Sequence, residues 1–493
     1  MSGRHVSVAL LIGAASCALA QRPGGAAQRA EQVPRNDPLV QRIIDEGLHH
    51  SHVQPDLEYL LDVIGPRLTG SAGMQRAVDW AQQKFREYGL SSVHAESWDF
   101  GKGWTRGPAT MRLLAPQERE LFGASWAWSP GTNGPAAGDV VLVDARSQAD
   151  FDRRFRGKLR GMWVMLGPAQ PITNPDAPPA THADSARIDS IARANAPHSP
   201  EEQQFFGQRQ YQIANEHALG IIRDGGKQFG LLSMSGSPAA ISPIPQVVIA
   251  NEDYDQFQRL LARGEHVRFE ANIANSFARD DLKQYNTVAE IRGTEAPDQV
   301  VLLGAHLDSW DLATGGTDNG AGAIAVLEAA RILTASGVHP KRTIRFVLFS
   351  GEEEGLFGSQ AYAADHRRDL EDYQAVLVLD NGTGRITGMA LQGQNDLADL
   401  WMHMFQPVDS LGLHGELVVR SGIKTGTDHL SFTQYGVPGF NYDQLTAGYN
   451  HTHHSQIDDY DHTVPADIAQ AATIMSVNAW QLADLPELLP RGR

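Results

Sequence analysis

The hydrophobic pattern divides the chain into three parts. Near the N-terminus, apolar residues recur with helical spacing at 39–47, at 57–63 and in a longer amphipathic stretch at 74–88. We therefore expect three helices in this part of the chain. From about residue 110 the pattern changes to short β-like runs, first DVVLVDA and GMWVMLG, later FGLLSMSG and PQVVIA. These runs predict a β-rich segment in the middle of the chain.

After about residue 285, apolar strands alternate with helices. The predicted strands are QVVLLGAH, TIRFVLFS and AVLVLD, and the helices between them cover residues 320–336 and 358–365. Continuous apolar strands separated by helices indicate an α/β domain, in which helices cover both faces of the sheet. Ligands of such sheets bind beyond the carboxyl ends of the strands. Function should therefore lie in the polar residues that follow these strands.

Length and charge narrow the class of protein. The 493 residues, of which 42% are apolar, suffice for two or three domains with a sizeable core. A formal net charge of -17 argues against a nucleic-acid partner, which requires a basic surface, but it favours the binding of metal cations. Beyond the N-terminal segment no run of about 18 apolar residues occurs, so we expect no membrane span.

The N-terminus has the pattern of an export signal. In MSGRHVSVALLIGAASCALAQ, Arg4 precedes a short apolar run, and Ala-Leu-Ala forms a cleavage site after Ala20. Residues 1–20 are therefore predicted to be a signal peptide and 21–38 a linker, which makes the protein periplasmic or secreted. The alternative is a lipid anchor on Cys17, the single cysteine, although AASC lacks the usual leucine three places earlier.

Polar clusters follow the predicted strands or lie in loops of the same domain. HLDSWD contributes His306 and Asp308, and TDNG contributes Asp318. Taken singly, the first is an ordinary polar strand end and the second an N-capping loop. The remaining acidic and histidine residues of these clusters are Glu352, Glu353, Glu354, Asp380, His451, His453, His454 and Asp458. Together they form the carboxylate and imidazole inventory of a divalent-metal site, for which zinc is the best fit.

Two metal ions fit this inventory better than one. A single catalytic zinc needs three protein ligands and a water, which would leave several carboxylates unused. A pair of ions about 3.5 to 4 Å apart requires a bridging carboxylate, offsets the excess negative charge and activates a shared water. A second glutamate beside a ligand glutamate can then take the proton from that water and pass it to the leaving amine.

The sequence lacks the motifs of other classes of enzyme. GTGRITG has its third glycine one place late for a dinucleotide fingerprint, and no helix is predicted to open there. The nucleophile elbow G-x-S-x-G and the zinc-protease motif H-E-x-x-H are both absent. A metal-free binding protein with the same fold remains an alternative, and zinc content distinguishes it from an enzyme.

Five motifs together resemble the co-catalytic zinc exopeptidase family, which includes bacterial leucyl aminopeptidases, glutamate carboxypeptidase and carboxypeptidase Q. They are HLDSWD, GGTDNGAG, GEEEGLFGS, VLDNG and HHSQID, in the family's order. YNTVAEIRG, HLDSWD and LADLPELLPR look most similar to the carboxypeptidase Q branch. The resemblance implies a central mixed, largely parallel sheet with helices on both faces. It also implies that 39–110 and 281–488 form the catalytic domain, with an inserted β-rich protease-associated domain at 111–280.

The resemblance also implies roles for individual residues. Asp318 would bridge the ions, Glu352 would be the general base, and Asp308 would be an orienting carboxylate. Glu354 would be a variable, exposed residue, and His453 is the nearest competitor of His454 as a ligand. The implied ligands of two Zn²⁺ per chain are His306, Asp318, Glu353, Asp380 and His454.

The substrate is expected to be a short peptide cleaved at its end. We expect an aminopeptidase, with a carboxypeptidase Q-like carboxypeptidase or dipeptidase as the alternative. Asp428 and His429 in KTGTDHLSF resemble a substrate-facing loop, although Asp428 is as well explained by capping of the next segment. The group that polarises the scissile carbonyl stays open among His453, Tyr442 and Tyr449. The resemblance makes a homodimer an expectation, and the Pro/Ala-rich insertion near 170–206 has no assigned role.

Overall fold

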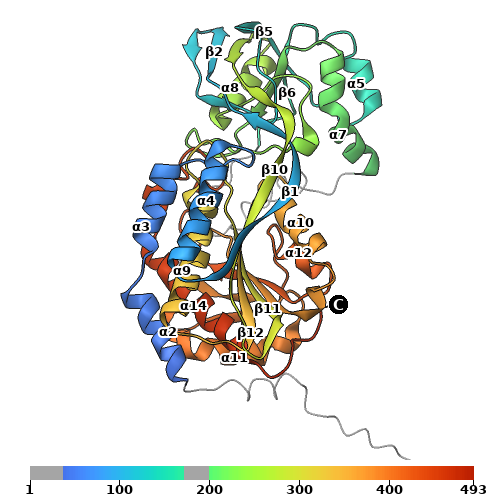
Figure 1. Ribbon diagram of the computed structural model, residues 1–493. Helices are drawn as coiled ribbons and strands as arrows, with labels where there is room; N and C mark the ends of the chain where they lie inside the picture. Colours follow the sequence, from blue (N-terminus) through green and yellow to red (C-terminus); the bar gives the residue numbers. More distant parts are fainter. Residues whose placement is uncertain (1–36, 171–198, 493) are drawn as a thin grey trace, which may run out of the picture.

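The structure is a computed structural model that describes residues 37–170 and 199–492. It consists of two sheets joined by two long strands (Figure 1). The predicted signal peptide with Cys17 lies outside the described residues, as does most of the Pro/Ala-rich insertion. No helix in the described part of the chain combines the length and apolar character that crossing a membrane requires.

The central sheet has eight strands, and its middle is parallel. β12, β11, β13 and β16 run parallel to one another, whereas β1, β10 and β14 join antiparallel to their inner neighbours and β15 pairs parallel with β14. In spatial order the strands are β1 (Ser91–Thr105), β10 (Ser276–Ile291), β12 (Arg342–Phe349), β11 (Ala296–His306), β13 (Tyr373–Val378), β16 (Gly439–Gln444), β14 (Ile386–Ala390) and β15 (Val418–Arg420). The sheet is therefore mixed and largely parallel.

Helices cover both faces of the central sheet (Figure 1). One face carries α2 (Pro38–His49), α3 (Val53–Glu58), the π-helix Tyr59–Ile64, α4 (Ala72–Glu87), α9 (Ala321–Ala335), α11 (Ala398–Phe405) and α14 (Pro465–Asp484). The other face carries α10 (Phe357–Asp365) and α12 (Leu430–Thr433). Because α9 is packed between the sheet and the outer helices, nearly all of its sequence AGAIAVLEAARILTA is buried. An all-round apolar helix of this kind is typical of a helix inside a core.

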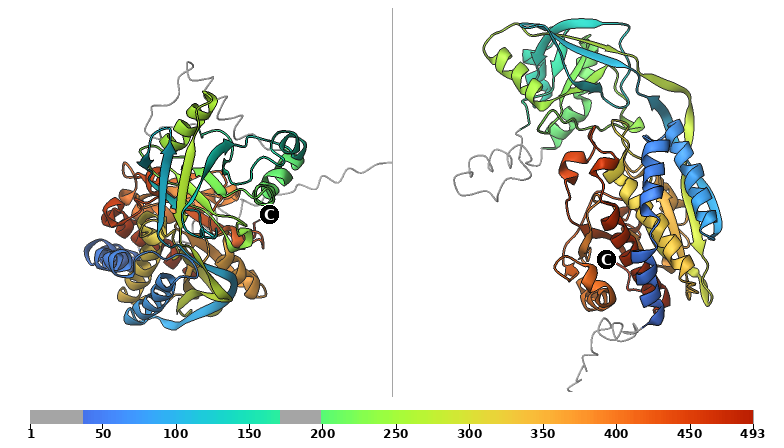
Figure 2. Two further views of the ribbon diagram at one scale, coloured as in Figure 1. Left: turned by 90° about the horizontal axis from the view of Figure 1, so that it is seen from above. Right: turned by 90° about the vertical axis from the view of Figure 1, so that its left-hand side faces the viewer.

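A second module, residues 109–273, is built on its own eight-stranded sheet at one end of the molecule (Figure 2). Its strands, in spatial order, are β3 (Arg119–Glu120), β2 (Ala109–Ala115), β9 (Arg268–Ile273), β5 (Ala136–Leu142), β6 (Trp163–Met165), β7 (Gly220–Asp224), β8 (Gln246–Ile249) and β4 (Gly123–Ser125). One face packs on α8 (Asn251–Ala262), and the other on α5 (Gln148–Arg154) and α7 (Pro200–Asn215). Whether this module is a protease-associated domain stays a prediction.

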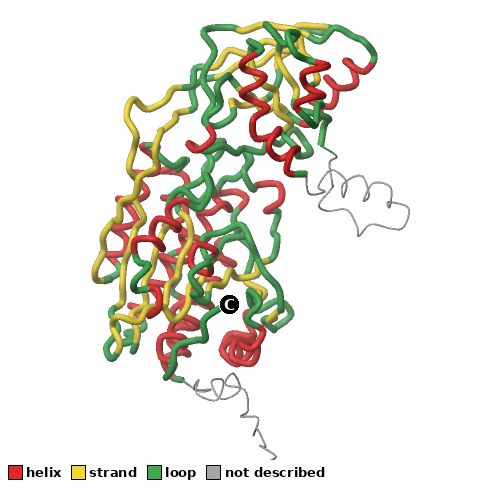
Figure 3. Tube along the Cα trace, turned by 90° about the vertical axis from the view of Figure 1, so that its right-hand side faces the viewer, coloured by secondary structure: helices red, strands yellow, loops and turns green. Residues whose placement is uncertain are grey.

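The two parts are joined by β1 and β10, which pair along most of their length (Figure 3). An aromatic cluster fills the junction. Trp98 and Phe100 come from β1, Trp128 from the second module, and Trp310 from the loop after β11. The ring of Trp128 lies 6.0 Å from that of Phe100 and 6.4 Å from that of Trp310. Apolar packing at this junction therefore fixes the second module against the part built on the central sheet.

Most predicted elements are confirmed, with one exception. The helices expected at 39–47, 74–88, 320–336 and 358–365 form as α2, α4, α9 and α10. The prediction that FGLLSMSG is β-like is wrong, because residues 229–236 form a loop. Its backbone bonds elsewhere: the Leu232 N–H donates to Gln456 Oε1 at 2.9 Å, and the Met234 N–H donates to the His454 carbonyl at 2.9 Å. An apolar run thus serves as a contact to the His454 loop.

Replacing Trp128 by Ala should loosen this junction. Trp128 is fully buried, so we expect the free energy of unfolding to fall by about 3–5 kcal/mol from lost contacts and the cavity left behind. Thermal and urea unfolding measure this loss. Phe229→Ala is the control, because Phe229 is 76% exposed. Equal free energies of unfolding for the two variants would contradict a stabilising role for the aromatic cluster.

Candidate metal centre

The residues predicted to bind metal come together at the carboxyl edge of the central sheet. His306 is the last residue of β11, Glu353 follows β12 by four positions, and Asp380 follows β13 by two. Asp318 lies in the turn Gly316–Gly320 that precedes α9, and His454 follows α13 (Tyr449–Thr452), the helix in the loop after β16. Because the parallel strands end at one edge, residues far apart in sequence meet there.

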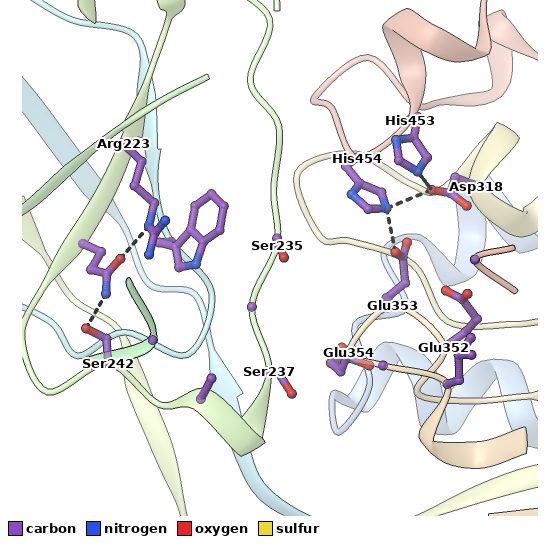
Figure 4. Close-up of a pocket in the computed structure, with 18 of the residues that line it drawn as sticks. Arg223, Ser235, Ser237, Ser242, Asp318, Glu352, Glu353, Glu354, His453 and His454 are labelled. Atoms are coloured by element: carbon purple, nitrogen blue, oxygen red, sulfur yellow. Dashed lines mark hydrogen bonds and ion pairs between the residues drawn. The ribbon is translucent and has the colours of Figure 1, made fainter. Parts of the chain in front are cut away.

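Asp318 is shared by two groups of side chains. On one side, His306 Nε2 lies 3.4 Å from Asp318 Oδ1 and 3.5 Å from Asp380 Oδ1. On the other side, His454 Nε2 lies 3.4 Å from Asp318 Oδ2 and 2.9 Å from Glu353 Oε2 (Figure 4). Each group offers the histidine and carboxylate atoms that zinc prefers. Ligand atoms close enough to hold one ion form two groups, His306 with Asp318 and Asp380, and Asp318 with His453 and His454, so the geometry offers two ion positions that have Asp318 in common.

Polar atoms of this cluster fit a metal and lack other partners. His306 Nε2, Asp318 Oδ2 and Glu353 Oε1 are buried and accept or donate no hydrogen bond within the described residues. On the protein's own charges, burial and the carboxylate of Asp318 raise the pKa of Glu353 well above its usual range. Burial likewise raises the pKa of Glu352. Burial opposes a charge on His306, but the carboxylates of Asp380 and Glu352 raise the pKa of its ring. Cations between these groups would relieve the repulsion.

Asp308 supports the glutamate turn. Its Oδ1 accepts the Glu352 N–H at 3.4 Å, and its Oδ2 accepts the Glu353 N–H and the Thr69 hydroxyl, both at 3.2 Å. His306 Nδ1 lies 3.1 Å from the Asp308 carbonyl oxygen, an arrangement that leaves Nε2 for a metal once Nδ1 carries the proton. Asp308 therefore positions both the histidine and the two glutamates.

Two further residues fix the ligand loops: Asp458, which the sequence placed in the metal-site inventory without a role of its own, and Arg67, which was not singled out from the sequence. Asp458 accepts the backbone N–H groups of Thr317 at 2.6 Å and of Asp318 at 3.1 Å. Arg67 is fully buried and donates to the carbonyls of Leu307 at 2.7 Å and Gly315 at 2.8 Å. Asp458 belongs to the motif HHSQID, whereas Arg67, between Pro66 and Leu68, belongs to none of the motifs.

Glu354 was expected to be exposed, and this expectation is wrong. It is 5% exposed, and both carboxylate oxygens are buried without a hydrogen bond among the described residues. The N–H groups of Gly355 and Leu356 both donate to the Glu352 carbonyl. This tight turn keeps Glu354 inside, where burial and the neighbouring Asp308 raise its pKa well above the usual range.

Asp428 and His429 lie behind the cavity wall. Both side chains are fully buried, and their loop reaches the cavity through Thr425 and Gly426 instead. Burial raises the pKa of Asp428 to about 7 and lowers that of His429 to about 4. Their expected position facing a substrate is thus corrected: the loop is in place, but other residues of it line the cavity.

The structure separates the three candidates for a carbonyl-polarising group. The Tyr442 hydroxyl donates to Asn478 Oδ1 at 3.0 Å, and the side chain is fully buried. His453 and Tyr449 both line the cavity, with ring centroids 5.0 Å apart. His453 Nε2 also lies 3.7 Å from Asp318 Oδ2. The candidates at the cavity are therefore His453 and Tyr449.

A cavity of about 850 Å³ lies between the metal centre and the second module. One wall carries carboxylates and histidines of the central sheet, including Glu352, Asp380 and His454. The opposite wall comes from the second module, including Trp126, Arg209 and Arg223. Figure 4 shows Arg223 across from the glutamates. Any substrate at the metal centre would therefore touch both parts of the protein.

The second module also holds the loop that carries His454. Lys227 Nζ donates to the carbonyls of Asn450 at 2.9 Å, His451 at 3.3 Å and His453 at 2.6 Å. The Met234 N–H bonds to the carbonyl of His454 itself. These contacts fix the backbone of a histidine loop whose side chains face the central sheet.

Comparisons with known proteins agree with this geometry. The model of peptidase family M28 matches residues 286–479. Carboxypeptidase Q of Bos taurus is 30% identical over 444 residues, which cover 88% of this chain and 86% of that protein. The chain belongs to peptidase family M28. As an M28 peptidase it is a metallo-exopeptidase, a hydrolase, and its family implies zinc.

Solved structures extend the M28 match to the whole fold. The crystal structure of an M28 peptidase precursor from Shewanella amazonensis has a TM-score of 0.75 and 26% identity, and the match covers 95% of this chain and all of that one. A zinc aminopeptidase from Bacillus subtilis has a TM-score of 0.60 at 18% identity, covering 88% and 94% of the two chains. The second of these shows the fold alone. The expected α/β class with a mixed central sheet is confirmed.

Replacing Lys227 by Met in this M28 peptidase should weaken metal binding. The change removes three hydrogen bonds to the backbone of the His454 loop, and loss of such outer contacts typically lowers metal affinity by about 10-fold or more. Competition with a chelator measures zinc affinity directly. Lys158→Met is the matched control, because Lys158 is exposed and donates to one carbonyl, that of Arg154. Equal zinc affinity of both variants would contradict the positioning role.

Proposed function

We propose that this M28 peptidase is a zinc aminopeptidase that removes the N-terminal residue from short peptides. The observation that carries the proposal is the arrangement around Asp318: two histidine-carboxylate groups share this residue, and Glu352 lines the cavity beside them. We infer that His306, Asp318 and Asp380 hold one zinc ion, and that Asp318, Glu353 and His454 hold the other. When bound, two such ions supply the Lewis acidity that activates water and polarises a carbonyl.

Glu352 is proposed as the general base. Its carboxylate lies 4.0 Å from His306 Nε2, yet it belongs to neither ligand group. It can accept a proton from the attacking water and return that proton to the nitrogen of the leaving amine. Asp308 holds Glu352 in place through the backbone N–H. His453 or Tyr449, both at the cavity, would donate a hydrogen bond to the carbonyl oxygen of the substrate.

Charge favours the amino end of a peptide at the metal centre. Two divalent ions supply four positive charges, one fewer than the five carboxylates that line this wall: Asp318, Glu352, Glu353, Glu354 and Asp380. A surplus of negative charge attracts the ammonium of a free N-terminus and repels a C-terminal carboxylate. The relatives named carboxypeptidase Q favour the second candidate, a carboxypeptidase or dipeptidase.

Export through the predicted signal peptide and assembly as a homodimer stay predictions. So does the identity of the second module as a protease-associated domain.

Replacing Glu352 by Gln should remove most activity while metal binding persists. The amide keeps the size of the side chain but cannot accept the proton, so we expect kcat to fall by roughly 10²- to 10⁴-fold. Zinc content should stay at two ions per chain, measured by elemental analysis. Glu371→Gln, at an exposed position, is the control. Full activity of the Glu352→Gln variant would show that another group is the base.

End-blocked peptides should distinguish an aminopeptidase from a carboxypeptidase. We expect the tripeptide Leu-Ala-Ala to lose its first residue, N-acetylation to abolish hydrolysis, and C-terminal amidation to leave kcat similar. Mass spectrometry identifies the residue released. Release of the last residue from the N-acetylated peptide would instead establish the carboxypeptidase.

A further inference from the structure

Two arginines line the cavity wall that the second module contributes. Arg223 lies in β7, Arg209 lies in α7, and both side chains are half-buried at the cavity. Among the residues that the structure describes, neither forms an ion pair with a carboxylate, and Arg209 Nε is buried without a hydrogen bond. The carboxylates of the metal centre lie on the opposite wall (Figure 4). The cavity thus has a negative wall and a positive wall.

Arg223 is held in a fixed orientation. Its guanidinium lies over the ring of Trp126, 4.4 Å from the centroid, and its Nε donates to Gln246 Oε1 at 2.6 Å. Gln246 is itself fixed, since its Nε2 donates to Ser242 Oγ at 2.6 Å and to Gln210 Oε1 at 2.9 Å. With Nε bonded and the ring below, the terminal nitrogens are left for a ligand. Such a pre-oriented fork matches the two oxygens of a carboxylate.

Placing these cations together without an anion is unfavourable. Burial, followed by the charge of Arg209, lowers the pKa of Arg223 to about 10. Burial also lowers the pKa of Arg209, whose guanidinium lies over the ring of Phe206. Both groups still carry their charge near neutral pH. Buried charges in proteins are ordinarily paired, so a missing anion is the simplest account of this wall.

We propose that Arg223, together with Arg209, binds a carboxylate of the peptide substrate while the peptide's amino end lies at the metal centre. The carboxylate is either the free C-terminus or an acidic side chain. The assignment of this carboxylate to a substrate rests on the proposed peptidase function. The inference that the arginines bind a carboxylate does not rest on it. In Figure 4 the segment with Ser235 and Ser237 separates Arg223 from the glutamates. The carboxylate is therefore bound away from the reacting bond.

The test compares free and amidated peptides of the series Leu-(Ala)n with increasing length. For the zinc-loaded enzyme we expect amidation to raise KM by roughly 10- to 100-fold at the lengths that reach the arginines, with kcat nearly unchanged. In Arg223→Met the two forms should have equal KM. Arg223→Lys, which keeps the charge but not the fork, should recover only part of the difference. Arg259→Met, at an exposed position of α8, is the control and should retain it.

A second arm distinguishes the two sources of the carboxylate. Amidated peptides with one Glu at successive positions should regain low KM if a side chain is bound, and this gain should also disappear in Arg223→Met. The proposal is overturned if amidation and acidic side chains leave KM unchanged at every length, or if Arg223→Met retains the preference of the parent enzyme.

Binding separates this inference from the proposed function. Calorimetry on the zinc-loaded Glu352→Gln variant, with and without Arg223→Met, measures peptide affinity without turnover. If the peptides with a free carboxylate bind more tightly and this preference requires Arg223, the carboxylate site is supported, even when the parent enzyme cleaves none of the peptides. If no such preference exists, the carboxylate site is overturned, even when the parent enzyme cleaves all of the peptides. Thermal unfolding checks that the variant folds: Arg223→Met loses the contacts to Trp126 and Gln246, so its Tm must still lie well above the assay temperature.

Discussion

Repulsion among buried carboxylates is the constraint on which the rest of this structure depends. The carboxyl edge of the central sheet gathers acidic side chains that water cannot solvate. Histidines, the backbone N–H groups that bond to Asp308 and Asp458, and the fully buried Arg67 each offset part of this charge. Two divalent cations would offset most of the remainder. We therefore expect the stability of the site, as well as its chemistry, to depend on bound metal.

The second module completes this site in two ways. It contributes the cavity wall opposite the metal centre, and Lys227 and the loop 225–236 hold the backbone that carries His454. The aromatic cluster around Trp128 keeps that wall at a fixed position relative to the sheet. The backbone of the His454 loop thus depends on a segment outside the matched family region, since 286–479 includes neither Lys227 nor the arginines.

Sequence patterns predicted the elements and the ligands but missed contacts between distant segments. Periodicity predicted α9 and β11, because each depends on local spacing, and the motifs shared with the family pointed to five candidate ligands that the structure brings together. The burial of Glu354, the loop form of 229–236 and the position of Asp428 depend on how separate segments pack. An apolar run such as FGLLSMSG predicts burial, but the sequence does not identify the segment against which the run packs. Arg67 acts through carbonyls from 65 to 315, which leaves no local pattern.

The hydrogen bond between the Met234 N–H and the carbonyl of His454 would couple peptide binding in the cavity to zinc binding. One short segment, residues 234–237, lines the cavity and also bonds to the backbone of His454, a candidate zinc ligand. If zinc and a peptide both act on this segment, thermodynamic reciprocity requires each to change the protein's affinity for the other by the same factor. A peptide that orders this segment would then reduce zinc loss, and zinc depletion would weaken peptide capture to an equal degree.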